Sequence, residues 1–230
     1  MRNFALILAT LALASCAGSR PSMPDRAINR ALAGAPGQAQ PSTIVSTELA
    51  FARMAREKGQ WTAFKEFAAD NALIFGANGA IEAKPWLAQQ VDPAQAVQWE
   101  PHFVRMSCDG SLAVSQGAFQ EPGGSVGTFY TVWERQQDGE YRYIFDFGFP
   151  QAEAPAKPDL IGSAIGDCSA VGKPLPIVAD GLNIRQSADG TLAWTFQVAG
   201  SPATRYFRVW QAKGEEMAIV IDVAVPPGAE

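Results

Sequence analysis

Apolar and polar positions alternate most regularly over residues 129–149, where two runs rich in β-branched and aromatic residues flank Asp138-Gly139. Asp-Gly favours the positive φ angles of a tight turn, so this pattern predicts a β-hairpin. A strict two-residue period places four rings on one face of its second strand: Tyr141, Tyr143, Phe145 and Phe147. The opposite face carries Arg142, Ile144, Asp146 and Gly148. A face with four rings must be covered, and we expect amphipathic helices to cover it.

Apolar residues at helical spacing precede the hairpin. Residues 43–58 predict a helix that Ser42 or Thr43 caps and Gly59 ends. Its apolar face comprises Val45, Leu49, Ala52 and Ala55. A second helix is predicted over residues 60–69, with an inner side made of Trp61, Phe64, Phe67 and Ala68. Pro85 suits the first turn of a third, short helix that reaches residue 90.

Strand-like runs fill the rest of this region. They cover residues 72–75, 97–107 and 112–120, and Pro101 indicates a bulge or an edge in the second of them. Helices grouped early and a meander late predict an α+β domain. We expect three N-terminal helices packed on a curved antiparallel sheet around a cone-shaped interior, over residues 43–150.

The C-terminal part has a different composition. Residues 151–158 are rich in Pro and Ala and predict a linker. Residues 159–230 predict a small antiparallel β extension with a short helix near residues 160–165. Its strands are expected at 192–198, 205–211 and 217–225. We expect this extension to close over the first domain or to lie beside it.

Several short motifs in the first domain resemble the nuclear-transport-factor-2-like superfamily. They are Ala50-Phe51-Ala52 with Gly59, Ala63-Phe64, Ala69-Asp70-Asn71-Ala72-Leu73-Ile74-Phe75, Thr131-Val132-Trp133-Glu134-Arg135, Asp138-Gly139 and Tyr141-Arg142. The resemblance covers about residues 43–150. It implies the cone-shaped fold shared with ketosteroid isomerases and SnoaL-like proteins, and it implies no single activity.

The known chemistries of this superfamily do not transfer to the chain. Matching Ala69-Asp70-Asn71-Ala72 onto the isomerase pattern puts Gly76 where the catalytic carboxylate would stand, and glycine cannot take a proton. Members that use a His-Asp pair need an imidazole, and the chain has one histidine, His102. We interpret His102 as structural and do not expect an isomerase.

The N-terminus carries a targeting pattern. Arg2 precedes an apolar run over residues 4–13, too short to span a bilayer and typical of an export signal. Leu13-Ala14-Ser15-Cys16 then resembles the bacterial lipoprotein signal, which implies that residues 1–15 are removed and Cys16 is lipidated. Ala17 is not the aspartate associated with inner-membrane retention, so we expect an outer-membrane lipoprotein facing the periplasm. The alternative is a non-lipidated signal cleaved after a small residue.

Composition adds little to this picture. Residues 16–42 are rich in Ala, Gly, Pro, Ser and Gln and predict a flexible tether. The net charge of −5, without a run of Lys or Arg, argues against nucleic-acid binding. Cys108 and Cys168 predict a disulfide in an exported protein, or two buried thiols. We expect no metal site, because the sequence has a single histidine, and no cofactor, because it has no phosphate-binding loop.

Candidate site residues gather in the expected cone. Trp86, Trp99, Tyr130 and Trp133 could line a pocket with Asp146, although core packing explains each ring equally well. Asp146 is a weak candidate for a general acid or base, and a structural hydrogen-bond acceptor is the alternative. Asp70 is interpreted as ending a helix and accepting bonds from loop amides.

These patterns lead to three functional hypotheses. The first is a cell-envelope lipoprotein whose cone binds a small apolar ligand or a protein partner without catalysis. The second is an enzyme of unknown reaction that uses Asp146 in the same cavity. The third is an envelope interaction protein that forms a homodimer through its sheet face.

Overall fold

The computed structural model describes residues 38–76, 79–173, 176–177 and 183–228. The predicted export signal, Cys16 and most of the predicted tether lie outside the described residues. Within the described part, no helix is long and apolar enough to cross a membrane.

Three helices stand where the sequence predicted them: α2 (Pro41–Lys58), α3 (Gln60–Phe67) and α4 (Ala83–Leu87). Gly59 adopts a φ of 116° between α2 and α3, a value that few other residues tolerate, so it ends α2 as predicted. Neither Ser42 nor Thr43 is the N-cap, because α2 begins at Pro41. The predicted apolar face of α2 is only partly confirmed. Ala52 and Ala55 are buried as predicted, whereas Leu49 is 45% exposed. The other buried residues of the helix are Ile44, Glu48 and Phe51.

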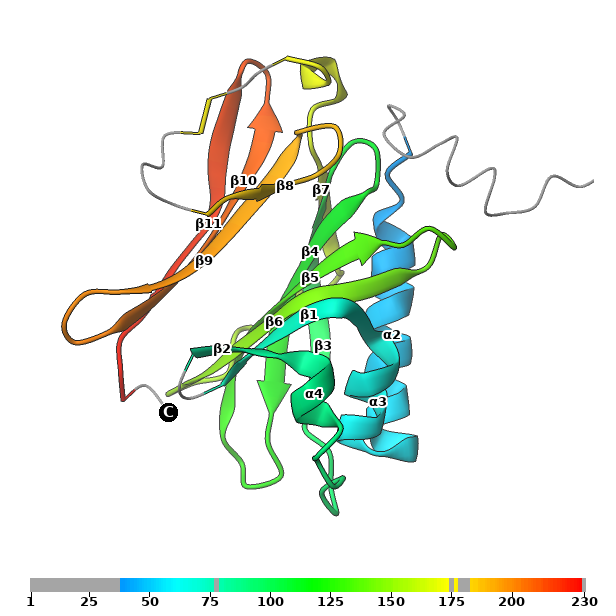
Figure 1. Ribbon diagram of the computed structural model, residues 1–230, viewed down its shortest axis with the longest axis vertical. Coiled ribbons are helices and arrows are strands. Elements are labelled where there is room, and N and C mark those ends of the chain that lie inside the picture. Colours follow the sequence, from blue (N-terminus) through cyan, green and yellow to red (C-terminus); the bar gives the residue numbers. More distant parts are fainter. Residues whose placement is uncertain (1–37, 77–78, 174–175, 178–182, 229–230) are drawn as a thin grey trace, which may run out of the picture.

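The helices cover one face of a seven-stranded sheet (Figure 1). Its strands in spatial order are β2 (Gly79–Glu82), β1 (Ala68–Gly76), β6 (Tyr141–Gln151), β5 (Val126–Arg135), β4 (Leu112–Gln120), β3 (Gln98–Met106) and β7 (Gly162–Ile165). The sheet is mixed, not antiparallel as predicted, because β1 pairs parallel with β6 and β7 pairs parallel with β3. The fold is α+β, with few helices and a large mixed sheet.

Strand β7 replaces the short helix predicted near residues 160–165. Residues 162–165 pair with Phe103 to Met106, so the backbone of β3 satisfies their hydrogen bonds. This pairing overrides the weak helical preference of four residues. The predicted C-terminal extension therefore contributes an edge strand to the first sheet.

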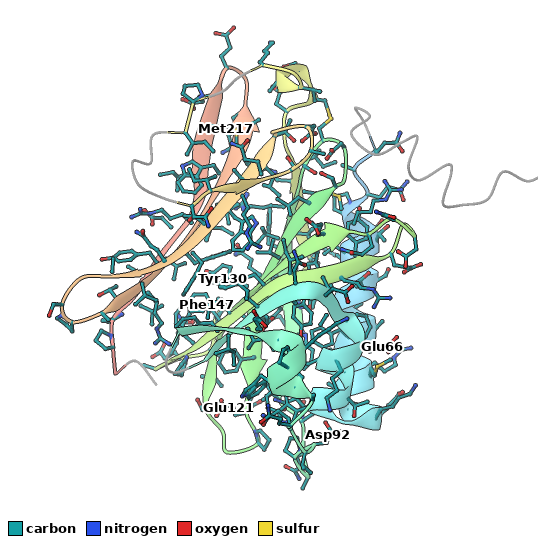
Figure 2. All side chains as sticks on the ribbon, in the orientation of Figure 1. Glu66, Asp92, Glu121, Tyr130, Phe147 and Met217 are labelled. Carbon is teal, nitrogen blue, oxygen red and sulfur yellow. A yellow bond between two sulfur atoms is a disulfide. The ribbon has the colours of Figure 1, made fainter. Side chains whose placement is uncertain are left out.

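A second, four-stranded antiparallel sheet lies against the face of the first sheet that the helices leave open (Figure 1). Its strands in spatial order are β11 (Glu216–Val225), β10 (Thr204–Lys213), β9 (Leu192–Ala199) and β8 (Arg185–Gln186). The predicted disulfide is confirmed, with Cys108 bonded to Cys168, 60 residues further along the chain. Figure 2 shows Tyr130 and Phe147 in the layer between the two sheets.

A β-bulge in β6 decides which side chains reach which layer. Trp133 pairs with Tyr143 while its neighbour Val132 pairs with Phe145, so Ile144 is an extra residue on β6. An extra residue exchanges the two faces of a strand. Tyr143 therefore packs under the helices, whereas Phe145 faces the second sheet. The prediction that four rings share one face is wrong, and the second sheet, not the helices, covers half of them.

The rings confirm this division in space. The centroid of Tyr143 lies 6.0 Å from that of Phe51 on α2. The centroids of Phe145 and Phe147 lie 4.9 Å and 5.5 Å from that of Phe196 on β9. Asp146, on the opposite side of β6 from Phe145, thereby faces the helices.

The second sheet repeats part of the first in sequence and in register. Residues 105–113 read RMSCDGSLA and residues 185–193 read RQSADGTLA. Further on, Val132-Trp133 of β5 corresponds to Val209-Trp210 of β10. The bulge recurs as well, since Trp210 pairs with Ile219 and Val209 with Ile221. We call residues 105–146 the first repeat and residues 185–222 the second repeat.

The turns of the two repeats contact each other reciprocally. The backbone N–H of Cys108 donates to Thr191 Oγ1 over 2.8 Å. At the equivalent positions, the N–H of Ala188 donates to Ser111 Oγ over 3.0 Å. Equivalent positions meet again in the core between the sheets, where the rings of Tyr130 and Phe207 lie 5.3 Å apart. The two repeats are therefore packed around an approximate twofold axis.

Candidate functional site

A cavity of about 240 Å³ lies between the helices and the first sheet. Aromatic side chains form most of its wall: Phe51, Trp61, Phe64, Trp99, Phe119, Phe129 and Phe149. They come from α2, α3 and strands β3 to β6, so the wall is assembled from residues far apart in sequence. The cavity is large enough for a molecule of about one or two rings, since a cavity of about 150 Å³ holds benzene.

Two details of the fold position these rings. A side chain at Gly117 would collide with the ring of Phe129, and one at Gly127 would collide with Phe119, so the two glycines leave room for the rings on the sheet. At the start of α3, Asp92 Oδ1 accepts hydrogen bonds from the backbone N–H groups of Trp61 and Thr62, over 2.6 Å and 3.0 Å. This contact stabilises the helix terminus that carries Trp61.

Few polar groups reach the cavity. Asp146 and Thr131 lie on neighbouring strands, and Thr131 Oγ1 donates to Asp146 Oδ2 over 2.9 Å. Burial raises the pKa of Asp146 to about 6, against the effect of the Thr131 hydrogen bond, which lowers it. Gln60 also lines the cavity, but its Oε1 accepts from the backbone N–H of Val97. Glu121 is exposed at the mouth, at the end of the molecule where Figure 2 labels it.

A second carboxylate lies behind the aromatic wall. Glu48 of α2 is fully buried. Its Oε1 accepts from Ser115 Oγ over 2.8 Å and from Trp133 Nε1 over 3.1 Å, and its Oε2 accepts from Trp99 Nε1 over 3.1 Å. Burial raises the pKa of Glu48 to about 7; the hydrogen bond from Ser115 opposes this effect and the charge of Asp146 adds to it. Glu48 therefore changes protonation near neutral pH.

The structure brings together only part of the predicted pocket. Trp99 and Asp146 line the cavity. Trp133 is in the core beside Glu48, and Tyr130 points between the two sheets, where it contacts Phe207. Trp86 packs edge-on against Trp61, at a centroid distance of 5.0 Å, and does not line the cavity.

Sequence reasoning missed Glu48 and most of the wall. The spacing of Ile44, Glu48, Phe51 and Ala55 would have placed Glu48 on the buried face of α2, but a glutamate in a helix usually faces water. Phe119 and Phe129 gave a weaker signal, because only the observed register of β4 and β5 puts them under the helices.

Other residues considered earlier lie away from the cavity. His102 occupies the bulge of β3, where Pro101 predicted an irregularity, with Nε2 3.8 Å from Glu100 Oε1. Asp70 lies in β1 and forms an ion pair with Lys84 over 2.5 Å, so its predicted role with loop amides is wrong. Gly76 ends β1 opposite Gly79. Across the described residues, no cluster of three or more His, Cys, Asp or Glu could hold a metal ion.

No protein-family model matches this sequence, and neither does any curated protein. Among the solved structures that resemble part of it are the following three. An NTF-2-like protein of unknown function from Shewanella oneidensis is 13% identical with a TM-score of 0.40, over 47% of this chain and 98% of its own. A protein from Parabacteroides distasonis, provisionally assigned as a ketosteroid isomerase, is 16% identical with a TM-score of 0.39, over 51% and 92%. A protein from Exiguobacterium sibiricum, provisionally assigned as a calcium/calmodulin-dependent kinase II association domain, is 16% identical with a TM-score of 0.35, over 50% and 97%.

The superfamily that the sequence resembles is the one for which the Shewanella protein is named. The identities are 13–16% and every TM-score is below 0.5, so these likenesses carry no argument about this chain, and its α+β fold is described by its own helices and strands. The chemistry of the cavity is therefore argued from its own residues.

Proposed function

We propose that the cone binds a small ring-bearing, largely apolar molecule without transforming it. The observation that supports this proposal is the cavity of about 240 Å³, walled by rings and open at the end marked by Glu121. Aromatic walls with few polar groups are typical of sites for such ligands. Glu121 at the mouth and Asp146 inside would orient the molecule.

Calorimetric titration of the purified soluble chain with small aromatic compounds tests this function. Gly148 lines the cavity, and a side chain there meets the ring of Phe119 at ordinary contact distance, so Gly148→Val fills space without a collision. We expect this variant to lose binding. Gly123→Val is the matched control, since nothing lies within 4 Å of its added Cβ in the β4–β5 loop. Equal binding by both variants would contradict the proposed site.

The runner-up is catalysis by Asp146. The specific observation in its favour is the pKa of about 6, which suits a group that both takes and gives a proton near neutral pH. The two hypotheses differ in the fate of the bound molecule. A ligand recovered unchanged by mass spectrometry after long incubation supports binding, whereas conversion that disappears in Asp146→Asn supports an enzyme.

We further propose that the protein is held at the outer membrane, facing the periplasm, through lipidated Cys16. The support is the resemblance of Leu13-Ala14-Ser15-Cys16 to a lipoprotein signal. Metabolic labelling with a fatty acid should mark the wild type and leave Cys16→Ser unlabelled. A homodimer remains the third proposal, but it would need a surface other than the sheet face, which the second repeat covers.

A further inference from the structure

The aromatic wall is suited to more than apolar contact. Each Trp or Phe ring has a quadrupole with a negative face and a positive edge, so a cation placed over the ring face is attracted to it. Trp61, Phe64 and Trp99 surround one side of the cavity. The ring centroid of Phe64 lies 5.5 Å from that of Trp61 and 6.1 Å from that of Trp99. Phe119, Phe129 and Phe149 close the other side. Such an enclosure can replace the water around an organic cation.

The cavity also holds an unbalanced negative charge. Asp146 accepts one hydrogen bond, on Oδ2, from the neutral hydroxyl of Thr131. None of the residues that line the described cavity is a Lys, an Arg or a His. The other acidic groups nearby add to the charge, with Glu121 at the mouth and Glu48 behind Trp99.

This situation differs from that of three carboxylates on the surface of the described chain. Asp70 has Lys84, Glu100 has Lys157 and Asp222 has Arg208 as an ion-pair partner. Asp146 is partly buried, and a carboxylate that is withdrawn from water without a cation is costly, because desolvation is not repaid by an opposite charge. A ligand that brings the missing positive charge would gain from this imbalance, whereas a neutral ligand would leave it in place.

We propose that the ligand of the cone is a small organic amine in its cationic form, with an apolar or aromatic body. The body lies among Trp61, Trp99 and Phe129, and the ammonium group lies beside Asp146. This inference rests on the proposed binding function and adds the charge class of the ligand. Asp146 selects the ligand through charge and hydrogen bonding, and the rings contribute cation–π attraction.

Two compounds of nearly equal shape test the inference: benzylamine, which is cationic at pH 8, and benzyl alcohol, which is neutral. Calorimetric titration at pH 8 should give benzylamine an affinity about tenfold higher. Asp146→Asn should reduce this preference to about twofold or less, because the carboxylate is gone while the hydroxyl of Thr131 keeps an acceptor. Asp222→Asn, at the equivalent position of the second repeat, should keep the full preference.

The outcomes separate the two levels of the proposal. Equal affinities for the two compounds in the wild type would overturn the cationic ligand and leave the proposed binding function standing. Failure of both compounds to bind would overturn the binding function and this inference with it. A preference that survives Asp146→Asn would overturn the role of Asp146. Thermal unfolding of both variants shows that any loss of binding comes from a folded protein.

Discussion

The two repeats place an aspartate at the same point of the same strand, and the two aspartates have opposite surroundings. In the first repeat, Asp146 pairs across the strands with Thr131 and lies under the helices. In the second, Asp222 pairs with Arg208, forms an ion pair with it over 2.8 Å and has a 51% exposed side chain. The strand position, register and bulge are shared by both aspartates, so they do not explain the surroundings of Asp146. The layer of helices that covers the first sheet does.

An equivalent pair of hydroxyl side chains near the two aspartates, Ser115 and Thr195, also differs in its hydrogen-bond partners. Ser115 of the first repeat donates to Glu48 of α2, whereas its equivalent Thr195 donates to the backbone carbonyl of Asn183. A polar side chain at this strand position is thus used for a buried carboxylate in one repeat and for a loop in the other. The comparison indicates that α2 and α3 account for the different surroundings of the two aspartates.

The largest expected effect comes from breaking the disulfide that ties the turn of the first repeat to the segment leading to the second repeat. Replacing both Cys108 and Cys168 by alanine removes the disulfide. Position 108 then carries alanine, as the equivalent position 188 of the second repeat does. Opening a loop of this length should lower the free energy of unfolding by about 4 kcal/mol. Urea unfolding measures the change. The double variant should be insensitive to reductant, and a loss under about 1 kcal/mol would contradict a stabilising role for the bridge.

Glu48, which has no counterpart over the second repeat, should make stability depend on pH. Its pKa is raised from 4.5 to about 7 in the folded protein, so its contribution is fully present below pH 4.5 and is lost as the pH rises through 7. Stability should therefore fall between pH 5 and pH 8, by an amount on the order of 3 kcal/mol. Asp146, whose folded-state pKa is also raised, adds a fall in the same direction.

Urea unfolding of Glu48→Gln at the two pH values isolates this contribution. The variant should show a flatter pH dependence and lower stability at pH 5. If the amide oxygen of glutamine keeps the contacts with Ser115 and Trp133, its NH₂ group faces Trp99 and cannot accept the hydrogen bond that Trp99 donates. Glu57→Gln, on the exposed side of the same helix, is the control and should follow the wild type. A wild type that is more stable at pH 8 than at pH 5 would refute the assignment.

The paired variants Asp146→Asn and Asp222→Asn test the comparison directly. The folded-state pKa of Asp146 is raised from 3.8 to about 6, so its charged form opposes folding at pH 8 and its protonated form does not at pH 4. Asp146→Asn should be more stable than the wild type at pH 8, by on the order of 2 kcal/mol, and equal to it near pH 4. Asp222→Asn loses an exposed ion pair and should change stability by at most about 0.5 kcal/mol.

Thermal and urea unfolding at both pH values decide this prediction. Two variants with the same small effect at pH 8 would mean that the helices do not change the environment of Asp146.

The smallest effect concerns the two reciprocal turn contacts. Thr191 is fully buried, and Thr191→Val leaves the N–H of Cys108 without its acceptor, at a cost of about 1–2 kcal/mol. Ser111→Ala removes the equivalent contact to Ala188, which is exposed, and should cost only a few tenths of a kcal/mol. The difference between the stability losses of the two variants measures how unequally the two turn contacts contribute. Equal losses would show that exposure does not distinguish the contacts.

Features of the fold that depend on local sequence could be predicted. The Asp138-Gly139 turn, the stop at Gly59 and the disulfide follow from residue chemistry and spacing, and the structure has all three. The placement of the three helices follows from apolar spacing in the same way. These features need no knowledge of which strand pairs with which.

Features that depend on pairing could not be predicted. The extra residue Ile144 is defined only by the register of β6 against β5, and it alone turns Phe145 away from the helices. Strand β7 exists because β3 offers it a free edge. Of the candidate site, Trp99 and Asp146 were found, while Glu48 was missed because its burial is set by three donors that come from other elements.

The second repeat reaches the open face of the first sheet as part of the same chain. Its effective concentration there is fixed by the connecting segment and does not change when the protein is diluted. A sandwich of two separate chains would fall apart at low concentration, and its melting temperature would fall with it. For this protein the melting temperature should be independent of concentration, so the two sheets should stay packed together even in very dilute solution.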